Sequence, residues 1–582
     1  MLTRRSVLSG VSAAGVAMVH ARRASADAAP LSVVVTINGQ NFAYREADGT
    51  DLGDFVSPIG GFTQRCVRTD LAGSPLSVFF RPDRGSDRAE IVFELGRLFN
   101  VATPAHLGAY TATIFRGDQQ IARVEVPTHY WFSRWRWQSA PRPIVADVGN
   151  LIGQRLLPPY DRAGGVLMDN LVSTCVPLPP KPGRPPSKKL ICTETNQPIW
   201  VPSTTLPSVM TGHTPYTVMG LAGVEPYMPR TGERPDIGLV TEPQAQYICT
   251  GASAPLNATM AQAEASGTVP WHMRDETTGA PINFRTYPRA NWYWDSRVGS
   301  PWVKTVESPV TPDSAHQPAL AYVPYMLTGD PYFLEEMQFA STFNWGTIPP
   351  NYRPGIPQSR SFAWSMRTLA QLARVTPSSV PSWLLPQSYW RGFLDENRVM
   401  LETVYVGASS PVRSMFRSTA DIESSRDEGA AAPGGTWIDP WQDEFVASVM
   451  GWILSMGFGD WQYAYDWKMG TDVARTSTTS GWVRAYATPY RVILRPERTA
   501  SFVRTWSEAW SLTQIVTGIP AVADPDRWVD PDMTYLAYTR GALAMARSIG
   551  TFGVDENLTW ATSQLRSAGW RTAYKWRIGT GL

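Results

Sequence analysis

The chain has 582 residues, of which 43% are hydrophobic and 18% are charged. This composition excludes a long disordered chain and a polytopic membrane protein, and at roughly 100–200 residues per domain the length allows several domains. Lys and Arg number 52 against 50 Asp and Glu, so no basic excess is available to bind nucleic acid. The 46 glycines and 49 prolines predict many turns, and the 24 tryptophans suggest a role beyond filling a core.

Residues 1–28 have the pattern of an export signal. The paired arginines Arg4 and Arg5 precede a weakly apolar run, Val7–Val19, and a small-residue site follows at Ala26–Ala28. The arginine pair resembles a twin-arginine signal, and the run is shorter than the roughly 20 apolar residues that span a bilayer. We expect cleavage near Ala28 and a periplasmic or secreted protein that is not held in a membrane.

Short β-branched and aromatic runs predict a β-sandwich domain over residues 29–145. Strands are expected at 31–37, 77–80 and 90–94, and residues 110–126 predict a hairpin that turns at Gly117-Asp118.

The segment Tyr130–Trp137 alternates aromatic with basic residues. It predicts either an amphipathic edge strand at a domain junction or a strip that binds sugars.

Residues 146–234 are rich in Pro, Gly and Thr and are expected to form a linker with long loops. Cys175 and Cys192 flank a proline-rich stretch there, and in an oxidising compartment they either staple this loop or remain two unpaired thiols. The four cysteines form no C-x-x-C motif, and no H-E-x-x-H pair occurs. We therefore expect no metal centre and no cofactor, although calcium held by loop oxygens stays open.

From residue 235 to 582 the pattern changes to recurring helix hairpins. Apolar helices end at a glycine and a second helix follows, over 243–265, 319–336, 449–465 and 535–565, with a further pair at 361–374 and 385–402. Five or six hairpins favour an (α/α) toroid, and the irregular spacing between copies disfavours the alternative, a solenoid.

A β-sandwich followed by such a toroid, in an exported chain rich in Trp, resembles the six-hairpin glycosidases and the toroid polysaccharide lyases. The segment Leu327–Glu335, with the sequence LTGDPYFLE, is similar to the hairpin turn common in these enzymes. The resemblance implies an α+β multidomain fold and an enzyme that acts on a carbohydrate.

In a toroid, the loops that precede the inner helices gather at one end, and several of these loops carry functional groups. Asp313 and His316 precede one predicted helix, Arg360 and Trp364 open another, and Asp439–Glu444 opens a third. Acidic residues at these positions are also ordinary helix caps. Asp443 and Glu444 go further, because a cap does not require two acids beside Trp441.

A second cluster lies in a long loop that contains His272, Arg274 and Asp275 and continues to Trp292, Trp294 and Asp295. Its simplest interpretation is a surface turn at Thr278-Gly279, and its aromatic content favours a binding or catalytic role instead.

Sugars suit this mixture, since their C–H faces stack on aromatic rings and their hydroxyls bond to Asp, Glu, Asn and Arg. Glycoside hydrolysis needs two carboxyl groups, and the candidate pair is Asp275 with Asp443 or Glu444, joined by His316 as a further candidate catalytic residue. The candidate substrate-binding residues are His272, Arg274, Trp292, Trp294, Asp295, Asp313, Tyr322, Arg360, Trp364 and Trp441.

The sequence thus predicts an exported glycoside hydrolase that acts on a poly- or oligosaccharide. The first alternative is a polysaccharide lyase on a uronate-containing glycan, with base and neutralising groups drawn from His316, Tyr322, Arg360 and His272. The second alternative is a non-catalytic glycan-binding envelope protein.

Overall fold

The structure is a computed structural model in which most of the chain is described. The described residues are 29–96, 106–162, 174–177, 189–194, 197–202, 215–228, 237–275, 277–292, 308–348, 350, 353–354, 359–406, 412, 436–497, 500–529, 533–551, 553–567 and 574–579. The expected export signal, residues 1–28, lies outside them.

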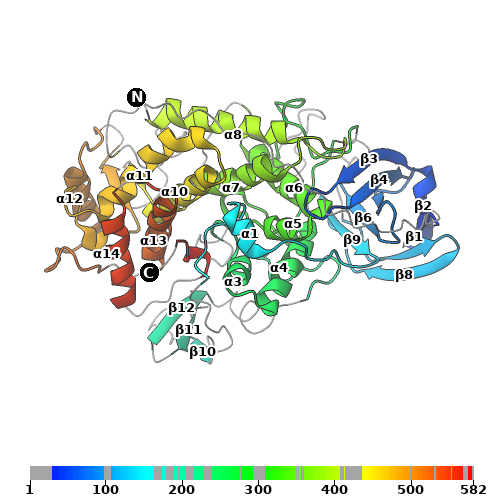
Figure 1. Ribbon diagram of the computed structural model, residues 1–582, viewed down its shortest axis with the longest axis horizontal. Coiled ribbons are helices and arrows are strands. Elements are labelled where there is room, and N and C mark those ends of the chain that lie inside the picture. Colours follow the sequence, from blue (N-terminus) through cyan, green and yellow to red (C-terminus); the bar gives the residue numbers. More distant parts are fainter. Residues whose placement is uncertain are drawn as a thin grey trace, which may run out of the picture.

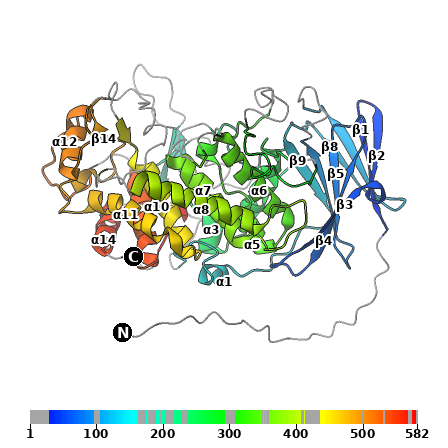
Figure 2. The ribbon, with the colours of Figure 1, turned by 90° about the horizontal axis from the view of Figure 1, so that it is seen from above.

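The chain folds into an N-terminal region rich in β-sheet and a helical region that follows it (Figure 1, Figure 2). Two antiparallel sheets form the first region, with strand orders β2-β1-β7-β8 and β3-β4-β5-β6-β9. Their bounds are β1 Leu31–Ile37, β2 Gln40–Arg45, β3 Thr50–Val56, β4 Thr63–Asp70, β5 Ser77–Pro82, β6 Ala89–Leu95, β7 Tyr110–Arg116, β8 Gln119–Val126 and β9 Ser133–Gln138.

The strands expected at 31–37, 77–80 and 90–94 are confirmed, as is the hairpin over 110–126. Strands β2, β3 and β4 were not predicted. β2 and β3 are largely exposed, so they lack the apolar alternation that marks a half-buried strand.

Strand β9 contains most of the segment Tyr130–Trp137, in which aromatic and basic residues alternate. Successive side chains of a strand point to opposite faces, so Arg134 and Arg136 share one face and Trp135 lies on the other. The ring of Trp135 stacks on Phe93 of β6, with centroids 4.1 Å apart. The two arginines bond to carboxylates of the helical region. The edge-strand interpretation at a domain junction is therefore confirmed.

The described part of the helical region contains five helix pairs at the predicted places. They are α3 Glu242–Thr250 with α4 Ser253–Ala265, α5 Tyr322–Thr328 with α6 Pro331–Thr347, α7 Ser359–Val375 with α8 Gln387–Leu401, α10 Pro440–Ser455 with α11 Gln462–Thr476, and α13 Met533–Ser548 with α14 Asp555–Ser567. The two helices of each pair pack together. Gly329 shows why glycine separates α5 from α6: its φ is +67°, and a Cβ there would collide with Ser57 of the sheet region.

The pairs also pack on one another along the chain. Helix α10 lies against α7 and α13, and α13 packs on the short helix η11 (Tyr574–Trp576), which packs on α3. Arg540 of α13 donates to the carbonyl of Trp576 over 3.1 Å, and Glu242 of α3 accepts from the amide of Lys575 over 3.0 Å. The C-terminal segment thus connects the last helix pair to the first.

Smaller elements complete the described structure: α1 Val148–Gly153, α12 Trp506–Thr517, β13 Thr436–Ile438 paired with β14 Val492–Arg495, and a three-stranded sheet of β10 Thr174–Pro177, β11 Lys189–Glu194 and β12 Gln197–Pro202. One continuous set of buried apolar side chains runs through both main regions. Among the described helices, none is at once long and apolar enough to cross a membrane.

The cysteines fall into two kinds. Cys66 and Cys249 are buried and free, and burial raises their pKa to about 11 and about 12. In the sheet that follows α1, the backbone register sets Cys175 of β10 directly opposite Cys192 of β11. Whether this second pair forms a disulfide stays a prediction.

Candidate active site

Two of the predicted binding residues, His272 and Arg274, belong to a buried charge network between sheet and helices, named here the junction network. It comprises Arg81, Glu90, Glu94, Arg134, Arg136, Glu264, His272, Arg274, Asp330, Glu335 and Glu336. Arg274 holds Glu94 through two nitrogens, each at 2.6 Å, and His272 Nε2 lies 3.0 Å from Glu336.

The carboxylates of the junction network are bonded to several cationic side chains. Glu335 accepts from Arg81 at 2.7 Å and from Arg274 at 2.8 Å, and it also bonds to Arg134. Burial alone opposes the ionisation of Glu336, but the charges of Arg134 and His272 and their hydrogen bonds lower its pKa to about 2. The network therefore joins the two regions, and the pKa values of its carboxyls Glu335 and Glu336 are lowered, which favours their ionised forms.

Asp275 lies next to this network and organises its own turn. Its side chain is buried and accepts from the amide of Thr277 over 2.9 Å, while its amide donates to the carbonyl of Ala280 over 2.8 Å. Gly279 completes the turn with a φ of +77°. The surface turn expected at Thr278-Gly279 is confirmed, since Thr277 and Thr278 are exposed, but the charged side chains of Arg274 and Asp275 beside it are buried and not solvated.

Asp443 and Glu444 lie inside the helical region, on the opposite side of α7 from the sheets (Figure 1). Asp443 forms an ion pair with Lys468 of α11, and Glu444 accepts from Arg475 over 2.9 Å and from Thr539 over 2.7 Å. The partners of Asp275 come from its own turn, whereas those of Asp443 and Glu444 come from α11 and α13. The structure thus places the two halves of the predicted carboxyl pair in separate clusters.

Three predicted aromatic residues serve as core. Trp292 packs edge-on against Phe343, Trp364 packs edge-on against Phe445, and the hydroxyl of Tyr322 donates to the carbonyl of Leu156. All three side chains are buried. Trp294 and Asp295 lie outside the described residues.

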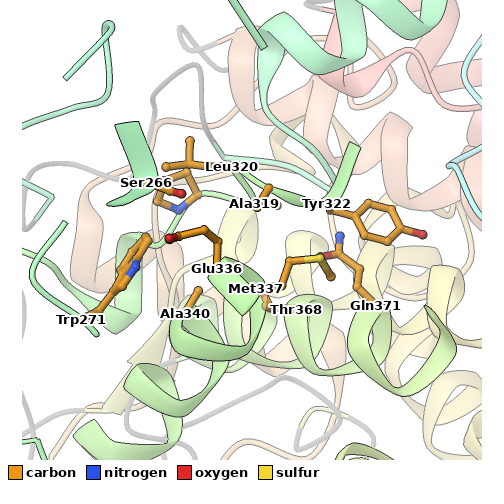
Figure 3. A pocket seen from close by; sticks show the side chains of 12 residues that line it. Ser266, Trp271, Ala319, Leu320, Tyr322, Glu336, Met337, Ala340, Thr368 and Gln371 are labelled. Carbon is orange, nitrogen blue, oxygen red and sulfur yellow. The ribbon is translucent and has the colours of Figure 1, made fainter. Parts of the chain in front are cut away.

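An internal cavity lies where α5, α6 and α7 meet the turn after α4 (Figure 3). Glu336 and Trp271 line one side of it and Gln371 and Tyr322 the other, and its volume is about 10 Å³. This volume suffices for a single water-sized molecule and is too small for a sugar ring.

Four other predicted residues do come together, where α7 and α10 begin. We name this group the α10 N-terminal cluster, and its members are Asp313, His316, Arg360, Trp437, Asp439, Trp441, Gln442, Tyr490, Arg491 and Tyr535. The amide of Arg360 donates to Gln442 over 3.3 Å, and Ser361 bonds to Ser314 over 3.3 Å. These bonds tie the start of α7 to α10 and to the short helix Ser314–His316.

Asp439 occupies the N-cap position of α10, yet its side chain does not cap the helix. Its Oδ2 accepts from Gln442 Nε2 over 2.9 Å, and its Oδ1 makes no hydrogen bond within the described residues. The Nε of Arg491 lies 3.9 Å from that oxygen, which is buried, although the Asp439 side chain as a whole is 23% exposed. Burial raises the pKa of Asp439 to about 6, against the opposing charges of Arg491 and Arg360.

Asp313 has the opposite environment. Its Oδ1 accepts from the amide of Ala315 over 3.0 Å, and its Oδ2 lies 2.6 Å from Nδ1 of His316. Burial alone would raise the pKa of Asp313, but these two bonds and the charges of His316 and Arg360 lower it below its ordinary value. Arg360 therefore acts on both carboxyl groups, of which Asp439 has a raised pKa and Asp313 a lowered one.

The cluster also contains several aromatic rings that contact one another. Trp441 stacks on Tyr535 with centroids 6.0 Å apart and planes at 13°, and Tyr535 contacts Tyr490 at 6.2 Å. Tyr490 is 54% exposed. The cluster thus combines a carboxyl whose pKa is raised, a carboxyl whose pKa is lowered and the exposed ring of Tyr490.

The sequence named Asp313, His316, Arg360 and Trp441 as candidates, and the structure brings them together, whereas Asp439 was not among the candidate catalytic residues. An aspartate directly before Pro440 predicts an ordinary helix cap. Nothing in the sequence indicates that the side chain of Asp439 does not cap the helix. Arg491, Tyr490 and Trp437 come from strands or the turns beside them, and no pattern in the sequence connects them with α10.

Comparison with known proteins yields no match to a family model, a curated protein or a solved structure. Within the described ranges, no group of three or more His, Cys, Asp or Glu side chains is placed to hold a metal ion.

Proposed function

We propose that the protein is an exported glycoside hydrolase that acts on an extracytoplasmic poly- or oligosaccharide. The N-terminal sheets would form a β-sandwich, and the five helix pairs an (α/α) toroid with its active site at the N-terminal ends of α7, α10 and α13. Support for a ring comes from the C-terminal segment, which bonds to both α13 and α3. Residues 1–28 would direct export, and sequencing of the mature N-terminus from the periplasmic or secreted fraction tests cleavage near Ala28.

The observation that carries this proposal is the carboxyl of Asp439. It sits at a helix N-cap without capping, its Oδ1 makes no hydrogen bond within the described part of the chain, and the neighbouring Arg491 contacts the exposed ring of Tyr490. Glu335 of the junction network differs, because it is fully buried and both of its oxygens accept hydrogen bonds.

The chemistry assigns different tasks to the two acids. Asp439 donates its proton to the glycosidic oxygen as the C–O bond breaks, and ionised Asp313 takes a proton from the water that attacks the anomeric carbon. His316 orients Asp313 through its Nδ1 contact at 2.6 Å. Pairs of carboxyl groups whose surroundings push their pKa values apart are the general signature of such acid and base roles.

Substitution of Asp439 is the decisive experiment. Asp439→Asn keeps the shape but cannot donate the proton, so hydrolysis of a responsive glycan should fall roughly 10²–10⁴-fold with KM little changed. Reducing-sugar release on a broad glycan panel provides the assay, and circular dichroism shows that the variant is folded. The same change at exposed Asp460 is the matched control and should leave the rate unaltered. Full activity of the Asp439→Asn variant would contradict the proposed role of Asp439 as the acid.

A polysaccharide lyase is a second candidate because His316, held by Asp313, lies in the same cluster as Arg360. There, His316 would take the proton α to a uronate carboxylate and Arg360 would neutralise the developing charge. The product distinguishes the two reactions. A lyase generates the ultraviolet absorbance of an unsaturated uronate, whereas the hydrolase releases reducing ends without it. Binding with no product on any glycan would favour a non-catalytic glycan-binding protein.

A further inference from the structure

Arg491 is held in an unusual way beside Asp439. Its guanidinium lies 4.6 Å from the ring centroid of Trp437 and 5.4 Å from that of Tyr490. Its only ion pair with a described residue is the 3.9 Å contact from Nε to Asp439, and within that part of the chain Nε makes no hydrogen bond. The side chain is 26% exposed. Aromatic contacts thus position this cation, while its Nε has no hydrogen-bond acceptor among the described residues.

The junction network shows what a purely structural arginine looks like in this protein. Arg274 and Arg136 are almost fully buried, and both hold a carboxylate through two nitrogens at hydrogen-bonding distance. Arg491 lacks both features. A guanidinium that is already ordered by neighbouring rings loses little freedom when it binds a planar oxyanion, which makes such a residue well suited to carboxylate or sulfate recognition.

The charges around Asp439 agree with an anionic ligand. Arg360 and Arg491 both lie close enough to influence the Asp439 carboxyl, and Asp313 is already engaged by His316. When Asp439 holds its proton, the two arginines face one ionised carboxylate. This local excess of positive charge exists although the whole chain is nearly balanced, with a formal net charge of +2.

We propose that Arg491 is a specificity-determining residue that binds the carboxylate or sulfate group of an acidic sugar next to Asp439, with the exposed face of Tyr490 against the sugar ring. This inference rests on the proposed function and narrows its substrate to anionic glycans. It also assigns Arg491 to the substrate, and not merely to Asp439 as a counter-ion.

The test compares the wild type with Arg491→Gln and Arg491→Lys on three kinds of glycan: a uronate polymer, a sulfated polysaccharide and a neutral polysaccharide. The wild type should prefer one of the acidic glycans. Arg491→Gln should raise KM, or the dissociation constant, for that glycan roughly ten- to hundredfold with kcat changed far less, as expected for loss of a charged hydrogen bond. Arg491→Lys should recover part of the affinity, and the exposed Arg547→Gln should match the wild type.

Each outcome bears on one of the two proposals. If the affinity for only one of the two acidic glycans depends on Arg491, that glycan identifies the acidic group, carboxylate or sulfate, that Arg491 binds. Preference for the neutral glycan, equal losses on charged and neutral glycans, or no binding of any acidic glycan would overturn the inference. Arg491-dependent binding without hydrolysis of any glycan would uphold it and refute the hydrolase. A shifted pH profile with unchanged glycan preference would mean that Arg491 serves Asp439 alone.

Discussion

The junction network and the α10 N-terminal cluster both set carboxylates beside arginines, yet their chemistry differs. In the junction network, Glu335 bonds to three guanidinium groups and has almost no exposure to solvent. In the α10 N-terminal cluster, Asp439 has one oxygen without a hydrogen bond and meets Arg491 only at 3.9 Å. The comparison teaches that buried charge does not by itself mark a functional site. The distinguishing feature is that the Asp439 and Arg491 side chains keep 23% and 26% of their exposure to solvent and approach each other only to 3.9 Å, whereas Glu335 and Arg81 are fully buried at 2.7 Å.

The largest expected effect tests the structural half of this comparison. Glu335→Gln leaves three buried arginines without a full counter-charge, so the free energy of unfolding should fall by about 3–5 kcal/mol. Urea denaturation at pH 7 measures it. The control is Glu125→Gln, an exposed pair on β8, which should change stability by less than about 0.5 kcal/mol. A loss below about 1 kcal/mol for Glu335→Gln would mean that the network is not what joins the two regions.

The pH dependence of activity tests the functional half. Asp439 must be protonated to act as the acid, and its pKa is raised to about 6. Above that pH, kcat/KM should therefore decrease by up to tenfold per pH unit, while Asp313, whose pKa is lowered, stays ionised. A profile from pH 4 to 9 at constant ionic strength provides the measurement. Activity that rises between pH 6 and 8 would contradict the assignment.

Stability should respond to pH in opposite directions in two buried clusters. Burial raises the pKa of Glu444 to about 8, so the folded state keeps a proton that the unfolded chain releases near pH 4.5, and stability falls as pH rises across that window. Glu336, with its pKa lowered to about 2, contributes stability above pH 4.5 that is lost on acidification.

Glu444→Gln tests the contribution of Glu444 to the pH dependence of stability. The variant should differ from the wild type by less than about 1 kcal/mol at pH 5 and gain relative stability towards pH 8, by at most about 1.4 kcal/mol per pH unit. Urea denaturation at both pH values is the measurement, and Glu335→Gln serves as the contrasting variant. A difference that does not change with pH would show that Glu444 is ionised throughout.

The smallest effect is expected at Asp275. Its carboxylate accepts a bond within its own turn, so Asp275→Asn should leave the rate within about threefold of the wild type for the folded protein. Reducing-sugar release alongside Asp439→Asn makes the comparison. If Asp275→Asn lowered the rate as much as Asp439→Asn does, Asp275 would again be a candidate catalytic residue.

The helix pairs were predictable because their signals are local. An apolar run, a glycine such as Gly329 and a capping residue such as Asp330 specify a hairpin within a few residues of chain. Strands β2 and β3 escaped prediction since their polar faces are exposed and their pairing is set by partners elsewhere. The register of β10 and β11 likewise placed Cys175 opposite Cys192, which the sequence had left open.

The candidate site likewise combines features that the local sequence predicts with features that depend on tertiary contacts. The sequence by itself determined that acids and aromatics would gather where helices begin, because caps and helix starts are local features, and it found Asp313, His316, Arg360 and Trp441. Only the tertiary structure decided which acids are bonded and which are not. Asp439 differs from an ordinary cap through the rotation of one side chain, and Arg491 reaches it from a distant turn, so the environment of both depends on neighbours that no local pattern specifies.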